Sequence, residues 1–320
     1  MRGRAAALAL ACLAALGAAP AHGSAAQVQI PDTLDGEPYG TLQAPGLVVR
    51  HAPRDSLVAG RVLAFLRTQT PLPGLAPGVP DGVTAVLAHS PAAFDALTGG
   101  TVPEWRAGVA FPAAALLVVP TGEGRRVLDP EGLRVLRHEW AHLGLHQAVQ
   151  SRVPRWFDEG YAQWASGGWD ASEAWRLRVL LALGRSPPLD SLTLSWPRER
   201  ASAEVAYLLA ASAITYLLRE SGERGLALFL DRWGEERSFE AALRGTFGVT
   251  SGQLEEDWRK HVRSEYGWLF VLSHSAVFWA ARTVALALMW RVRARLNRER
   301  LARLRAEEIA ERPDFWNPRE

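Results

Sequence analysis

Two histidines and a glutamate stand close together in the middle of the chain, in the run His138-Glu139-Trp140-Ala141-His142. Residues four apart on an α-helix lie one above the other on the same face, so both imidazoles can reach one metal ion. Glu139 lies about 100° around such a helix from His138, close enough for its carboxylate to hold a water molecule. The spacing predicts a zinc site with His138 and His142 as ligands and Glu139 as general base.

A catalytic zinc ion needs a third protein ligand and one open position. The only cysteine, Cys12, lies in a segment that we expect to be removed, so the third ligand must be a histidine or a carboxylate. Glu159, seventeen residues after His142, is the candidate that a second helix folding back would bring opposite the histidines. Asp158 is the alternative ligand, although its place favours a cap of that second helix.

This HExxH motif, followed by the segment W-F-D-E-G-Y-A at residues 156–162, resembles the gluzincin branch of zinc peptidases, in the peptidase MA clan. The resemblance covers roughly residues 83–305 and is to small membrane-anchored bacterial members. It implies one zinc ion per chain bound by His138, His142 and Glu159, with Glu139 as the base. It also implies an oxyanion donor at Tyr207, for which the alternative is a tyrosine of the core. The metzincin extension is absent, because Leu145 and Ala148 stand where that pattern needs glycine and histidine.

Three neighbouring features each have two interpretations. His146 continues the face of His138 and His142 by one turn, too far to share the same ion easily, so we expect it to pack or to support a ligand. Gln163, one turn beyond Glu159, either accepts the second N–H of a ligand histidine or is an exposed helix residue. The strand predicted at 114–119 is either an ordinary strand or, as the resemblance implies, a sheet edge that pairs with the substrate backbone.

The elements that must position these residues follow from apolar periodicity and helix-end signals. Asp129 suits a helix cap and Pro130 a first helical position, so the motif helix is predicted from there to about residue 149. Strands are predicted at 47–50, 83–88 and 114–119. Other helices are predicted at 56–68, 91–97, from about 157, and at 202–220, 225–233, 238–244 and 251–263. Strands come first and helices after, so the predicted fold class is α+β, with a small N-terminal sheet followed by a helical zincin-like core.

The N-terminal end has the features of a secretory signal at residues 1–23. Arg2 and Arg4 precede a short apolar stretch, and small residues follow at 19–23. An uncleaved N-terminal anchor is the alternative. Residues 24–46 are polar and rich in Gly and Pro, which predicts a linker before a peptidase domain at 47–265.

The C-terminal end contains a second apolar run, at residues 268–290, with a tryptophan at each end. Its length fits a bilayer core, which needs ~20 helical residues. Seven arginines between 291 and 305 follow, so the positive-inside rule predicts a transmembrane helix with the tail 291–320 in the cytoplasm and the catalytic domain extracytoplasmic. Arg282 and His274 oppose a span, and an amphipathic helix on the membrane or on the domain is the alternative.

Composition excludes several classes of protein. Hydrophobic content of 48% and charged content of 22% indicate a folded chain, and a formal charge of only +2 implies no large surface for nucleic acid. The sequence therefore predicts a membrane-anchored zinc metallopeptidase with peptide or protein substrates. The alternatives are a catalytically silent binding or assembly module of the same fold, and a zinc hydrolase of a non-peptide amide.

Overall fold

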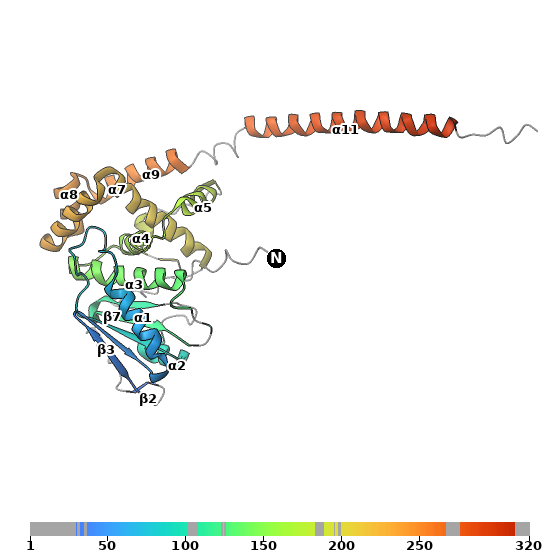
Figure 1. The fold of residues 1–320 in the computed structure, drawn as a ribbon. Coiled ribbons are helices and arrows are strands. Elements are labelled where there is room, and N and C mark those ends of the chain that lie inside the picture. Colours follow the sequence, from blue (N-terminus) through green and yellow to red (C-terminus); the bar gives the residue numbers. More distant parts are fainter. Residues whose placement is uncertain are drawn as a thin grey trace, which may run out of the picture.

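The computed structural model describes residues 30, 33–34, 37–100, 108–122, 124, 126–182, 189–194, 196–197, 200–266 and 276–310. A sheet with flanking helices forms one side of the domain, and a group of helices forms the other (Figure 1). This arrangement confirms the α+β class, with a small sheet and a mainly helical core. The predicted signal at 1–23 lies outside the described residues.

The main sheet has five strands in the order β3-β4-β5-β7-β6. Its three central strands are parallel neighbours: β4 (Leu47–His51), β5 (Val83–Ala88) and β7 (Leu116–Pro120). The outer strands β3 (Gly40–Ala44) and β6 (Val109–Phe111) pair antiparallel with β4 and β7. A separate two-stranded ladder joins β1 (Thr33–Leu34) to β2 (Glu37–Pro38).

Two hydrophobic clusters cover the two faces of the sheet, which explains why β5 and β7 are apolar without alternation. One cluster contains Leu87 and Leu117 and is covered by α1 (Ser56–Arg67) and the motif helix. The other contains Val86 and Val118 and is covered by α2 (Pro91–Thr98). Short 3-10 turns lie at Pro53–Asp55 and Pro112–Ala114.

The strand predictions are correct for the centre of the sheet and wrong at its margins. β3 falls inside the expected linker, so the linker prediction is wrong for residues 40–44, which pair with β4. β6 was not predicted, because three residues are too short to show an alternating pattern. The strand before the motif helix is not an edge, since β7 lies between β5 and β6, and the edge is β6.

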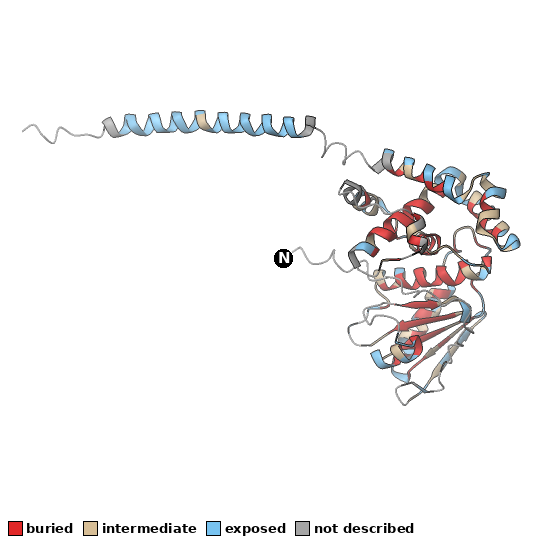
Figure 2. Cartoon of the chain, turned by 180° about the vertical axis from the view of Figure 1, so that it is seen from behind, coloured by how far each residue is buried: buried red, intermediate tan, exposed pale blue. Residues whose placement is uncertain are grey.

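The helical part is built around α3, α4 and the first half of α7, whose residues are mostly buried (Figure 2). The motif helix α3 packs on β6 and β7 with one side and on α4 and α7 with the other. The helices of this part are α3 (Pro130–Val149), α4 (Arg155–Ala165), α5 (Ala171–Ala182), α6 (Leu189–Leu194), α7 (Arg200–Glu236), α8 (Phe239–Phe247) and α9 (Ser251–Tyr266). α7 is kinked at Gly222, which has a φ of 67° and joins two helical stretches, in agreement with the separate helices predicted at 202–220 and 225–233.

The last helix, α11 (Ala276–Ala310), stands apart from the domain (Figure 1). Its side chains are exposed from Trp279 to Glu307, except at Ala294 (Figure 2). In the described part of the chain, no helix combines the length and apolar character needed to cross a membrane. The first eight residues of the span predicted at 268–290 lie outside the described residues, and the described remainder does not support that span.

A glycine allows α4 and α7 to approach closely. A Cβ added at Gly160 would lie 2.5 Å from the carbonyl oxygen of Ala210 and 3.0 Å from Ile214 Cγ1. The first of these atoms is backbone and cannot rotate away. Because Gly160 directly follows Glu159, this contact fixes how far α4 lies from α7 at the position of the predicted third ligand.

Gly160→Ala should therefore lower the free energy of unfolding by about 1–3 kcal/mol, the usual cost of overpacking a core. Gly60 provides the matched control, because it also lies inside a helix but an added Cβ there meets nothing within 4 Å. Gly60→Ala should raise the free energy of unfolding by about 0.5–1 kcal/mol. Urea denaturation measures both, and an equal effect of the two substitutions would contradict the packing argument.

Candidate metal centre

The motif helix α3 begins as its sequence predicts. Asp129 is the N-cap, and its Oδ1 accepts a hydrogen bond of 2.8 Å from the backbone N–H of Gly132. Pro130 occupies the first turn, where its missing N–H leaves no donor unsatisfied. Gln150 ends the helix in the left-handed region, with a φ of 45°. His138 and His142 thus lie in the middle of a helix that is fixed at both ends.

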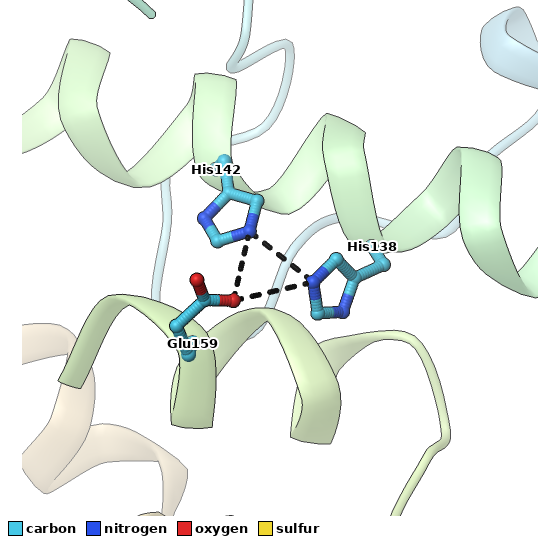
Figure 3. A group of neighbouring side chains, drawn as sticks. All are labelled: His138, His142 and Glu159. Atoms are coloured by element: carbon cyan, nitrogen blue, oxygen red, sulfur yellow. Dashed lines mark hydrogen bonds and ion pairs between the residues drawn. The ribbon is translucent and has the colours of Figure 1, made fainter. Parts of the chain in front are cut away.

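α4 returns against α3 and brings Glu159 to the histidines, as the sequence predicts. The Nε2 atoms of His138 and His142 are 3.2 Å apart (Figure 3). Glu159 Oε2 lies 3.7 Å from the first and 3.6 Å from the second. All three side chains are buried, and the exposed fraction of Glu159 is 1%.

The three atoms fit a zinc ion. A tetrahedral zinc ion with bonds of about 2.0–2.1 Å separates its ligand atoms by roughly 3.3–3.4 Å, close to the spacing found here. Within the described residues, neither carboxylate oxygen of Glu159 has a hydrogen-bond partner, although both are buried. A buried carboxylate without such a partner is costly unless it binds a cation. The donor set of two imidazoles and one carboxylate suits zinc.

Asp158 lies behind the three candidate ligands. Its Oδ1 is 2.6 Å from His142 Nδ1 and its Oδ2 is 3.1 Å from His146 Nε2. Asp158 is not the helix cap that we expected, because the N-cap of α4 is Pro154. Its carboxylate faces the far nitrogen of His142, away from the point where the three ligand atoms meet. His146 contacts Asp158 and not the three ligand atoms, so a supporting role for it stays a prediction.

The charges around His142 change two pKa values. Burial disfavours the charged imidazole, but the carboxylates of Asp158, Glu159 and Glu139 outweigh it and raise the pKa of His142 to about 10. Burial also favours the neutral form of Asp158, yet His142 and His146 hold the pKa of that carboxyl far below its usual range. Asp158 therefore remains a carboxylate with two oxygens that accept hydrogen bonds.

Gln163 does not orient a ligand. Its Nε2 donates to the carbonyl of Gly168 at 3.1 Å and so closes the turn after α4. The orienting contact predicted for it comes instead from Asp158. The sequence did contain a signal for this contact. A second carboxylate, Asp158, directly precedes Glu159, on the turn of α4 that faces α3.

Glu139 connects the site to the sheet. Its side chain is buried, and its Oε2 accepts a hydrogen bond of 2.9 Å from the backbone N–H of Ala110, in the middle of β6. Gly108 lies against the same side chain, since a Cβ there would be 3.3 Å from Glu139 Cγ. The predicted base thus lies between the metal ligands and the edge strand, a contact that no local pattern could reveal.

Comparison with known proteins identifies the family. A family model described as the peptidase MA superfamily matches residues 93–264, more than half of the chain. The chain belongs to the peptidase MA superfamily. The matched range contains the motif helix, Glu159 and Tyr207, and it confirms the resemblance found in the sequence.

Other comparisons add little to this peptidase MA assignment. No curated protein matches the chain. One similar solved structure is a mutant of a two-domain M1 zinc metallopeptidase bound to L-tryptophan, with 16% identity and a TM-score of 0.35. The match covers 69% of this chain and 51% of that one, so this chain spans about half the length of that protein.

Aromatic side chains line the site of this peptidase MA protein. The centroid of the Tyr207 ring, from α7, lies 6.5 Å from that of the His138 ring, and the ring centroids of Trp196 and Tyr207 are 5.0 Å apart. Trp196 in turn stacks under Arg155, whose Nε is 3.9 Å from Glu159 Oε1. The structure therefore places Tyr207 beside the metal centre, as predicted, while its role as oxyanion donor stays a prediction.

The metal content of three variants tests the ligand set. The purified full chain should hold one zinc ion, and His142→Ala should lose it because only two ligands remain. Glu159→Gln should bind zinc more weakly, since a neutral amide replaces the carboxylate. Glu139→Gln is the control and should keep its zinc. Elemental analysis after dialysis measures all three, and loss of zinc from Glu139→Gln but not from Glu159→Gln would contradict the assignment.

Proposed function

We propose that this protein is a zinc-dependent metallopeptidase that hydrolyses peptide bonds. One observation carries the proposal: three buried ligand atoms meet at one point, and the carboxylate of Glu139 is held beside them on the edge strand. The three ligands and the base are all present, as His138, His142, Glu159 and Glu139. This argues against a catalytically silent module of this fold. Membership of the peptidase MA superfamily supports the same conclusion.

His138, His142 and Glu159 would hold the ion through Nε2, Nε2 and Oε2. When bound, zinc supplies Lewis-acid chemistry, because it lowers the pKa of a coordinated water molecule and polarises a carbonyl group. Glu139 accepts the proton of the attacking water at its carboxylate and passes it to the leaving amine. Its hydrogen bond from Ala110 holds that carboxylate in place while it does so.

β6 gives the site a means of binding a peptide. In the described part of the chain, β6 pairs with β7 alone, so the main-chain groups of its other edge that are not bound to Glu139 can pair with a further strand. A peptide that adds to this edge would be held by main-chain hydrogen bonds next to Glu139, with little dependence on its sequence. Tyr207 would then donate a hydrogen bond from its hydroxyl to the developing oxyanion, which is the role that the resemblance implies.

We also propose that the C-terminal region anchors the catalytic domain to the outer side of the cytoplasmic membrane. Exposed apolar side chains on α11 support this proposal, since they include Trp279, Leu286, Leu288, Met289 and Trp290. Seven arginines follow between 291 and 305, a pattern typical of the cytoplasmic end of a membrane segment.

Peptide hydrolysis is the first test of the proposed function. The full chain should cleave members of a mixed peptide library, lose this activity in a zinc chelator and regain it when zinc is added. Glu139→Gln should fold and bind zinc, but its turnover should fall by ~10²–10⁴, the usual contribution of a general base. Zinc binding without cleavage of any peptide by the wild-type chain would contradict the proposal and favour a silent module or a non-peptide amide hydrolase.

Reporter fusions test the anchor. A reporter placed after Glu320 should be active in the cytoplasm, whereas one that replaces the chain after Tyr266 should be exported. The physical reason is the arginine cluster, which resists translocation across the membrane. If both reporters lay on the same side, the proposed membrane-spanning anchor would be wrong.

A further inference from the structure

Three histidines lie one turn apart on the same face of α3, but they have two different environments. His138 and His142 direct their Nε2 atoms toward Glu159 Oε2. His146 directs its Nε2 toward Asp158 Oδ2 at 3.1 Å. Two adjacent residues of α4 therefore contact this face of α3. Glu159 faces His138 and His142, and Asp158 contacts His142 and His146.

The chemistry of metal binding explains why His142 needs Asp158. A histidine that binds a cation through Nε2 must carry its proton on Nδ1. The Nδ1 atom of His142 is 2.6 Å from Asp158 Oδ1, so this proton is donated to a buried carboxylate. That hydrogen bond fixes both the tautomer and the direction of the ring. By contrast, His138 Nδ1 is buried and has no hydrogen-bond partner among the described residues.

Asp158 itself needs a second contact to hold this position. Its side chain is 3% exposed, and a carboxylate with a single hydrogen bond can rotate about its last torsion. His146 donates to the remaining oxygen, so both oxygens are fixed and the carboxylate plane is set from two sides. The side chain of His146 is 27% exposed, so this chain of contacts runs from the metal centre toward the surface.

We propose that Asp158 and His146 are positioning residues, and that the hydrogen bond from His146 to Asp158 sets the affinity of His142 for the metal. This inference rests on the metal-binding part of the proposed function and not on peptide hydrolysis. His142 is the ligand that depends on a hydrogen-bonded support, whereas packing against Tyr207 holds His138. Loss of His146 therefore weakens metal binding from a position that does not touch the metal.

Two variants of His146 separate a hydrogen bond from simple packing. His146→Gln places an amide N–H near the position of Nε2, whereas His146→Leu has similar bulk and no donor. The full chain with His146→Leu should bind zinc roughly 10-fold more weakly, and His146→Gln should stay within about threefold of wild type. Asp158→Asn should lose ~10–100-fold, because an amide offers one accepting oxygen where two histidines need one each.

Gln147→Ala is the matched control. Gln147 follows His146 on the same helix and makes two hydrogen bonds, at 2.7 and 2.9 Å, but these go to the backbone of Asp81. Its loss should leave zinc affinity unchanged. The measurement is competition for zinc against a chromophoric chelator, with circular dichroism as a check on folding.

The visible spectrum of the cobalt-substituted protein gives a second signal that does not depend on turnover. His146→Leu and Asp158→Asn should change the position and intensity of the cobalt bands, while Gln147→Ala should not. If folded His146→Leu kept wild-type zinc affinity and cobalt spectrum, the inference would be overturned. If it failed to fold, the comparison of Asp158→Asn with His146→Gln would decide, and wild-type zinc affinity in both of these variants would equally overturn the inference. A wild-type chain that binds zinc but cleaves no peptide would contradict the proposed function alone.

Discussion

The burial of Glu159 between α3, α4 and α7 is the constraint on which the rest of the site depends. A carboxylate with 1% exposure and no hydrogen-bond partner among the described residues is stable only if a cation or a close set of donors compensates it. A metal ion bound by the two Nε2 atoms that face Glu159 would supply that cation. Gly160 sets the depth of α4 against α7, so the packing of two helices determines where the third ligand lies.

One side chain, that of Glu139, links the edge of the sheet to the metal centre. Glu139 belongs to the motif helix, but its carboxylate is held by the N–H of Ala110 on the edge strand. In consequence, the proposed base and the proposed peptide-binding edge cannot move independently of each other. On the opposite side, Asp158 and His146 hold His142 through its far nitrogen. The metal centre is thus fixed by the sheet on one side and by the turns of α3 and α4 on the other.

What the sequence could predict was local. The cap at Asp129, the limits of α3 and the approach of Glu159 follow from spacing and helix-end chemistry, and the structure agrees with each of them. The edge position of β6, the contact of Ala110 with Glu139 and the role of Asp158 arise from residues that meet only after folding. The periodicity of a sequence does not indicate contacts between residues that lie far apart along the chain. The kink at Gly222 is a further local feature, since the sequence predicts separate helices at 202–220 and 225–233 and the positive φ of Gly222 lies between them.

The metal centre can be tested most directly by a crystal structure of the zinc-loaded protein with anomalous data collected at the zinc edge. We expect one zinc ion, bonded to His138 Nε2 and His142 Nε2 at about 2.0–2.1 Å and to Glu159 at about 2.0–2.2 Å. Glu139 should lie outside the coordination sphere, and Asp158 should remain bonded to His142 Nδ1. A zinc ion held by Asp158 or Glu139, or bound away from these helices, would contradict this assignment of the ligands.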